Sequence, residues 1–91
     1  MTTNNRFIKD PEAVLDYEIN WTDWLNGDTI STSAWTVPSG LTEDSNSKTT
    51  THAKVWLSSG TAGQTYAVGN KIVTTGLRTD ERTIYIECKE L

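Results

Sequence analysis

Two runs of alternating residues near the C-terminus constrain the fold of this chain more than any other feature. A period of two, rich in β-branched and aromatic residues, is typical of a half-buried strand. The residues that share one face are Tyr66, Val68, Asn70, Ile72 and Thr74 in the first run, and Arg82, Ile84, Ile86 and Cys88 in the second. The connecting TTGLRTDE contains a glycine and an aspartate, which turn a chain readily. The sequence therefore predicts an antiparallel hairpin.

Four further strands are expected upstream of this hairpin. They cover residues 15–21, 29–37, 41–43 and 49–58. A bulge near Ser33-Ala34 would explain why the apolar residues of the second of these strands change parity. Residues 44–48 are polar and are predicted to form an exposed loop. Thr22 to Leu25 suit one helical turn, with Thr22 or Asp23 as its cap.

No ten-residue stretch of the chain has helical periodicity, which excludes a parallel α/β sheet. The short strands and their turn signals predict an all-β, antiparallel β-sandwich of about six to seven strands, with one short helical turn at Thr22–Leu25. Residues 63–68, Gly-Gln-Thr-Tyr-Ala-Val, have the pattern of a tyrosine corner, in which the tyrosine hydroxyl returns to the backbone a few residues upstream. This pattern favours an immunoglobulin-like sandwich.

The length of 91 residues allows one domain. We expect residues 11–91 to form the sandwich domain, because Pro11 restricts the residue before it to extended geometry. Residues 1–10 are predicted to be an N-terminal arm that lies outside the core. Two interpretations of the arm stay open: a frayed terminus, or a segment that docks Phe7 and Ile8 on a neighbouring protein.

Charge and composition exclude several classes of function. The formal net charge of −4 disfavours nucleic acid and anionic membrane surfaces as partners. One cysteine excludes an internal disulfide, and one cysteine with one histidine leaves a structural zinc site almost without ligands. No apolar run approaches the roughly 18 residues of a membrane span, and the N-terminus lacks the apolar region of a signal peptide. We therefore expect a soluble protein.

Two groups of acidic and amide residues could bind a cation. Asp16, Glu18 and Asn20 share one face of a predicted strand, where two carboxylates could also serve acid–base chemistry. A solvated strand face displays the same pattern, and we favour that interpretation. A second group, with close oxygen ligands suited to Ca²⁺, consists of Asp23, Asn26 and Asp28. Such residues are also common turn formers, which is the simpler explanation.

The residue types of a hydrolase triad are present in His52, Ser58, Ser59 and Asp80. Neither serine lies in the Gly-x-Ser-x-Gly context of a nucleophile elbow. Cys88 falls on the inner face of the last strand and is expected to act as a small core residue. We therefore predict that the protein is not an enzyme, with no catalytic residues, no cofactor and no metal ligands.

Contacts with a partner are a better explanation for several exposed residues. A core of this size buries one or two of the four tryptophans, so others must be partly exposed or lie at interfaces. An exposed tryptophan such as Trp56 could stack on a sugar or anchor a protein interface. Charges crowd the predicted hairpin tip and are either solvated or used in docking. The predicted partner-binding residues are Phe7, Ile8, Trp56, Arg78, Asp80, Glu81 and Arg82.

A family resemblance rests on motifs spread along most of the chain. These are Lys9-Asp10-Pro11-x-Ala13-Val14-Leu15-Asp16-Tyr17, Trp21-x-x-Trp24-Leu25-x-Gly27-Asp28-Thr29-Ile30, Trp35-x-Val37-Pro38-x-Gly40-Leu41, Val55-Trp56-Leu57-Ser58-x-Gly60-Thr61-Ala62-Gly63 and Arg78-x-Asp80-Glu81-Arg82. In order and spacing they resemble a family of small tailed-phage proteins described as fiber-tail adaptors. The similarity runs from about Lys9 to near the C-terminus.

That resemblance implies an immunoglobulin-like, non-enzymatic structural protein of the virion that joins tail fibers to the tail. The implied partners are other virion proteins, such as tail adaptor, nozzle or fiber subunits, in multiple copies within a symmetric assembly, with no nucleic acid and no membrane. The implied location is the tail region of the virion, after a stay in the host cytoplasm before assembly. The alternatives are a capsid decoration or head–tail joining protein, and a glycan-binding β-sandwich module.

Overall fold

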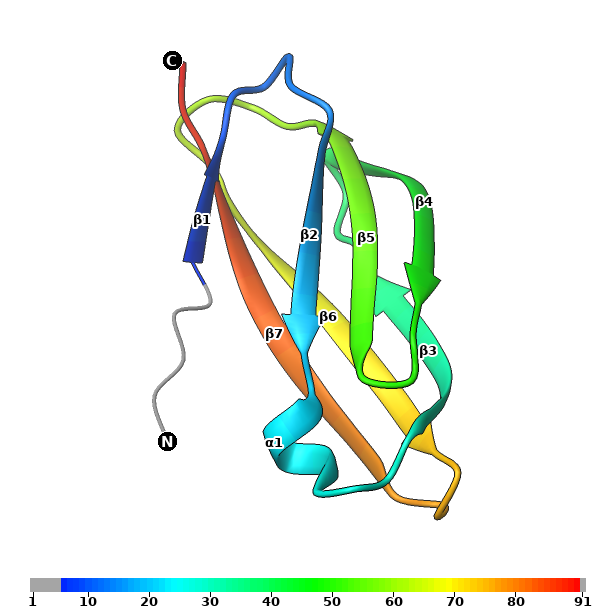
Figure 1. Ribbon diagram of the computed structural model, residues 1–91. Coiled ribbons are helices and arrows are strands. Elements are labelled where there is room, and N and C mark those ends of the chain that lie inside the picture. Colours follow the sequence, from blue (N-terminus) through cyan, green and yellow to red (C-terminus); the bar gives the residue numbers. More distant parts are fainter. Residues whose placement is uncertain (1–5, 91) are drawn as a thin grey trace.

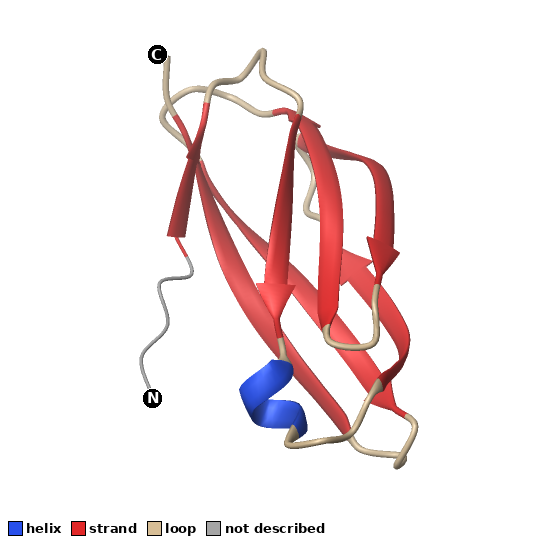
Figure 2. Cartoon of the chain, in the orientation of Figure 1, coloured by secondary structure: helices blue, strands red, loops and turns tan. Residues whose placement is uncertain are grey.

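Seven strands and one helical turn make up the part of the chain that the computed structural model describes, residues 6–90 (Figure 1). The elements are β1 (Arg6–Lys9), β2 (Leu15–Asn20), α1 (Thr22–Leu25), β3 (Ile30–Thr36), β4 (Leu41–Lys48), β5 (His52–Ser59), β6 (Thr65–Thr74) and β7 (Thr79–Cys88). Strands dominate, and the single helical turn lies at one end of the molecule (Figure 2). The predicted all-β class is confirmed.

The strands form two sheets that pack as a sandwich. One sheet has the order β1-β7-β6-β3, and the other has the order β2-β5-β4. All neighbouring pairs are antiparallel except β1 and β7, which run parallel. The β1–β2 connection and the end of β7 lie at one end of the sandwich, whereas α1 and the tip of the β6–β7 hairpin lie at the opposite end (Figure 1).

The β6–β7 hairpin is the central pair of the larger sheet, as the alternating runs predict. Its inward residues are buried from Val68 to Thr74 on β6 and from Ile84 to Cys88 on β7. They face the buried residues of the second sheet, Tyr17, Ile19, Ala53, Val55 and Leu57. Burial of these side chains is the main favourable contribution to folding in a domain of this size.

The helical turn forms where the sequence predicts it, but its cap differs. Trp21 occupies the N-cap position and makes no side-chain capping bond. Instead, the Asn20 side chain accepts a hydrogen bond of 2.9 Å from the Thr22 N–H, so neither Thr22 nor Asp23 is the cap. Trp21 and Leu25 are both fully buried and close this end of the core.

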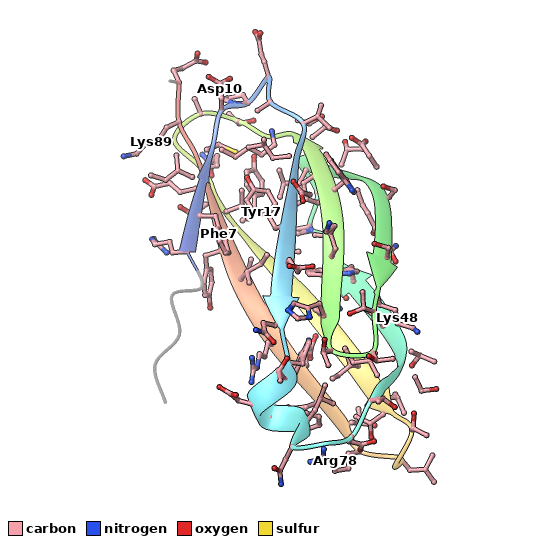
Figure 3. The ribbon with its side chains drawn as sticks, in the orientation of Figure 1. Phe7, Asp10, Tyr17, Lys48, Arg78 and Lys89 are labelled. Atoms are coloured by element: carbon pink, nitrogen blue, oxygen red, sulfur yellow. The ribbon has the colours of Figure 1, made fainter. Side chains whose placement is uncertain are left out.

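Strand β1 corrects the prediction that residues 1–10 lie outside the core. Arg6–Lys9 pairs with β7, and Phe7 packs on Tyr17 with 5.2 Å between ring centroids (Figure 3). Lys9 is fully buried because its ammonium group donates to the carbonyl oxygens of Ser59 (2.6 Å) and Asp10 (2.9 Å) and contacts that of Pro11 (3.4 Å). Residues 1–5 of the predicted arm lie outside the described residues.

Strand β4 corrects the prediction of an exposed loop at residues 44–48. These residues continue a strand that pairs with β5, although their side chains are exposed. Backbone pairing with β5 holds this segment without burial of its side chains, so the sequence shows no alternation of apolar and polar residues there. The bulge of β3 lies between Ile30 and Thr32 rather than at Ser33-Ala34, and a second irregularity lies between Glu43 and Ser45 of β4.

The tyrosine corner is present. The Tyr66 hydroxyl accepts a hydrogen bond of 3.0 Å from the backbone N–H of Thr61. Gly40 packs against the Tyr66 ring, where a Cβ atom would lie 2.8 Å from Cε1, and its φ of +102° favours glycine in addition. The corner therefore ties the β3–β4 and β5–β6 connections together at one end of the sandwich.

No helix in residues 6–90 is long and apolar enough to cross a membrane.

Candidate interaction surface

The tip of the β6–β7 hairpin is held against α1 by two arginine–tryptophan stacks. The Arg78 guanidinium lies 4.4 Å from the Trp24 ring centroid, and that of Arg82 lies 4.3 Å from the Trp21 ring centroid. The two indoles meet edge to face, with centroids 5.4 Å apart. Arg78 and Arg82 also donate to the carbonyl oxygens of Leu25 (2.7 Å) and Asn20 (3.3 Å), respectively. Both arginines therefore stabilise the contact of the tip with α1.

Asp28 braces the same tip from the loop after α1. One carboxylate oxygen accepts hydrogen bonds from the backbone N–H groups of Thr29 (2.8 Å) and Gly76 (3.1 Å), and the other pairs with Arg78 Nε at 3.2 Å. These bonds favour the ionised form. The side-chain hydrogen bond from Thr74, followed by that from the Thr29 backbone, lowers the pKa of Asp28 to about 2.

The four charged residues predicted at the hairpin tip differ in what they contact. Arg78 and Arg82 make the intramolecular stacks and hydrogen bonds described above. Asp80 accepts a hydrogen bond of 2.8 Å from the neighbouring backbone N–H of Glu81, and the Glu81 side chain is exposed. Their role in binding a partner stays a prediction.

The remaining predicted partner-binding residues lie on other surfaces. Phe7 points into the sandwich and packs against Tyr17, whereas Ile8 is exposed on the outer face of the larger sheet. Trp56 is 39% exposed on the outer face of the smaller sheet. The structure therefore does not bring the seven predicted residues to one surface, and the role of these three in binding also stays a prediction.

The outer face of the smaller sheet is mostly polar around Trp56. Asp16 lies opposite Trp56 on β2, and Ser45 lies opposite it on β4. Lys54 pairs with Asp16 at 3.7 Å and lies opposite Glu18 in the register. The acidic face predicted for β2 is therefore exposed and partly neutralised by Lys54. Exposed pairs of this kind contribute little to stability.

The residues that could form a hydrolase triad do not assemble. His52 and Ser58 lie six positions apart along β5, which separates them by roughly 20 Å. The Ser58 hydroxyl donates to Asp44 at 3.1 Å, and a ring nitrogen of His52 lies 2.7 Å from the Thr51 hydroxyl. Asp80 belongs to the other sheet.

The oxygen ligands considered for a cation have protein partners or lie apart. Both carboxylate oxygens of Asp28 are engaged by the chain itself. Among the described residues, no group of three or more histidine, cysteine or acidic side chains is placed to hold a metal ion. Cys88 is a free thiol and fully buried, as its inward position predicts. Burial is the main cause that raises the pKa of the nearby Tyr17 to about 12.

Sequence reasoning assigned no role to the most exposed large apolar side chain of the described residues. Leu77 lies in the β6–β7 turn, is 85% exposed and has a φ of +67°. Its signal in the sequence is a single apolar residue between Gly76 and Arg78, inside a turn that is otherwise polar. The charged residues around Leu77 suggested ion pairing or docking, whereas in the structure Arg78 and Arg82 contact tryptophan rings and backbone carbonyl groups of the chain itself.

One comparison with known proteins finds a match. The model of a protein family described as podophage GP4 fiber-tail adaptor protein gp77 matches residues 9–87, which is most of the chain. Comparison with curated proteins finds no match. The matched segment includes every strand except the first residues of β1 and the end of β7.

Proposed function

Because this chain belongs to the podophage GP4 fiber-tail adaptor protein gp77 family, we propose that it is a non-enzymatic structural protein that joins tail fibers to the tail of a podophage. The family match over residues 9–87 is the observation that carries this proposal. A rigid sandwich with braced loops suits such a role, since a joint between large assemblies requires surfaces that hold their geometry.

We infer that the sandwich is immunoglobulin-like. Its sheets, β2-β5-β4 and β7-β6-β3, have the order of strands B-E-D and G-F-C in immunoglobulin constant domains. The tyrosine corner at Tyr66, at the start of the penultimate strand, supports the same assignment. Strand β1 then corresponds to a first strand that pairs with the last one.

The proposed partners are other virion proteins, namely tail adaptor, nozzle or fiber subunits, with several copies of this chain in a symmetric ring. The chain would reside in the host cytoplasm until it is built into the tail. Its mechanism is geometric: exposed loops and sheet edges make the contacts, and pairing at a free sheet edge is one route for such a joint.

Mass spectrometry of purified particles tests this function. Peptides of this chain should be present in intact particles and should be lost when tails and fibers are stripped from the heads. Retention on stripped heads would instead support the alternative role in capsid decoration or head–tail joining. Complete absence from intact particles would contradict a structural role in the virion.

A glycan-binding module is the second candidate, favoured by the exposure of Trp56 on the outer face of the smaller sheet. Asp16, Lys54 and Ser45 surround this indole with groups that can hydrogen-bond sugar hydroxyls. Titration with host surface glycans should quench tryptophan fluorescence if this candidate is right, and Trp56→Ala should abolish the quenching. A flat titration with the wild-type protein would remove the candidate.

A further inference from the structure

Leu77 combines two features that each oppose stability. Its side chain is 85% exposed, more than any other large apolar residue in the described chain, so it gains almost nothing from burial. Its φ of +67° places it in the left-handed region, where a side chain crowds the following carbonyl oxygen. Within residues 6–90, the other residues with positive φ are four glycines, Asn26 and Ser59. Leu77 is thus the one apolar residue among them.

Neighbouring groups hold Leu77 in this conformation. Its N–H donates to the Thr74 carbonyl at 2.9 Å, and the Thr74 N–H donates to the Arg78 carbonyl at 2.8 Å. The Arg78 N–H donates to the Thr74 hydroxyl at 2.9 Å, and the Gly76 N–H donates to Asp28 at 3.1 Å. Arg78 is in turn fixed to α1 by its contacts with Leu25 and Trp24. The turn is therefore ordered before any partner arrives.

Local packing gives no reason for a leucine at this position. Leu77 lies outside the hydrophobic core cluster. The β6–β7 turn that contains it is at the end of the sandwich remote from the β1–β2 connection (Figure 1). A glycine or an asparagine would fit the backbone with less strain. Backbone strain that the surrounding structure enforces is common where a residue serves in recognition, and an ordered anchor loses little entropy on binding.

We propose that Leu77 is an anchor residue that inserts into an apolar pocket of the neighbouring virion protein. This inference rests on the proposed adaptor function and deepens it, since it assigns the contact to the hairpin tip. Arg78 and Asp28 support the anchor by fixing the turn, and their charges are already paired with each other. Because the proposed adaptor role requires contact with other virion proteins, we assign the pocket to a different protein rather than to a second copy of this chain.

The test replaces Leu77 in a phage whose own gene for this chain carries a stop codon, with the protein supplied from a plasmid. Leu77→Asn keeps a residue that tolerates positive φ and removes the apolar side chain, whereas Leu77→Met keeps an apolar side chain of similar volume. Val14→Asn is the matched control, because Val14 is 54% exposed in a different loop. Quantitative mass spectrometry measures the amount of this chain per particle.

We expect Leu77→Asn to lower incorporation roughly tenfold or more, while Leu77→Met and Val14→Asn stay within about twofold of wild type. The purified Leu77→Asn protein should unfold at the same Tm as wild type or at a higher one. An unchanged or higher Tm shows that lower incorporation comes from lost binding and not from lost folding. A Leu77→Asn protein that incorporates like wild type would overturn the anchor and leave the adaptor function standing.

Two other outcomes would also overturn the anchor. If the wild-type chain is absent from particles, the adaptor function and the anchor fail together. If purified wild-type protein forms a dimer in sedimentation and Leu77→Asn is a monomer, the pocket lies on a second copy, which contradicts the assignment to a different protein.

Discussion

The Trp21 indole nitrogen donates a hydrogen bond of 3.0 Å to the side-chain oxygen of Asn70, and both residues are fully buried. Trp21 follows β2 of the smaller sheet, and Asn70 lies in the middle of β6 in the larger one. The Asn70 amide group donates in turn to the Ser33 hydroxyl at 2.9 Å and to the Ala34 carbonyl at 3.3 Å. This side chain therefore links both sheets through the core.

Replacement of Asn70 should destabilise the protein strongly. Asn70→Ala leaves the Trp21 N–H without its acceptor in the core and opens a small cavity, so we expect a loss of about 3 kcal/mol in the free energy of unfolding. Urea denaturation followed by far-UV circular dichroism measures this. Asn46→Ala, on the exposed side of β4, is the control and should change stability by less than about 0.5 kcal/mol. Similar losses in both variants would contradict the role of Asn70.

Lys9 should hold β1 in place through the hydrogen bonds of its buried ammonium group. Lys9→Met keeps the length of the side chain but removes the donors to the carbonyl oxygens of Ser59, Asp10 and Pro11. Buried carbonyl groups without donors are costly, and we expect a loss of about 2 kcal/mol in the free energy of unfolding. The Lys89 N–H, which donates to the Lys9 carbonyl at 3.0 Å, should lose hydrogen-exchange protection first.

The control for this variant is Lys71→Met, which removes an ammonium group from the exposed outer face of β6. It should leave exchange at Lys89 unchanged. Faster exchange at Lys89 in both variants, or in neither, would show that the buried ammonium group does not hold β1 in place.

The hairpin, the helical turn and the tyrosine corner could be predicted because their signals are local. The period of two indicates which residues of β6 and β7 share a face, and the pattern Gly63-x-x-Tyr66 indicates the corner. Strand β1 gave no such signal: it spans four residues, and its inward pair is Phe7 and Lys9. A lysine is expected in solvent, and only the fold shows that three carbonyl oxygens surround it.

The candidate site was harder to predict than the fold for a related reason. Charge along the sequence does not report which partner each charged group contacts. Arg78 and Arg82 stack on Trp24 and Trp21, residues more than fifty positions away in the chain. The exposed large apolar residue at the tip is Leu77, and its proposed role depends on its φ and its exposure, neither of which can be read from residue type alone.

Acid should weaken the hairpin tip through Asp28. The folded protein holds the pKa of Asp28 at about 2, below its ordinary value of 3.8, so its contribution to stability is present above about pH 4 and is lost as the pH falls toward 2. Asp28→Asn lacks this titration. We therefore expect Asp28→Asn to be less stable than wild type at pH 5, and the difference in Tm to narrow at pH 2. A difference that is equal at both pH values would contradict the assignment.

Arg82 should contribute to stability through Trp21. Arg82→Gln removes the guanidinium that covers the indole and the hydrogen bond to the Asn20 carbonyl, and we expect a loss of about 1 kcal/mol by urea denaturation. Glu81→Gln, at an exposed neighbouring position, is the control and should have little effect. A stability equal to wild type in Arg82→Gln, together with lower incorporation into particles, would instead favour a direct role for Arg82 in docking.

Tyr17 differs from Asn70, because its buried polar group does not stabilise the fold. Its hydroxyl is buried beside Phe7 and Cys88 and has no hydrogen-bond partner in the described chain. An unpaired buried hydroxyl costs about 1–3 kcal/mol, so its removal in Tyr17→Phe should offset the loss of packing volume. We expect Tyr17→Phe to be as stable as wild type at pH 7, or more stable by up to about 1 kcal/mol.

The pH dependence distinguishes this explanation from simple packing. Burial raises the pKa of Tyr17 to about 12, from an ordinary value of 10, so the wild-type protein should lose stability as the pH rises from 10 to 12, where only the unfolded chain ionises readily. Tyr17→Phe lacks this loss, and its advantage in Tm should grow over that range. Tyr85→Phe, on the outer face of β7, is the control. An advantage that does not grow above pH 10 would mean that the Tyr17 hydroxyl reaches a partner or water in solution.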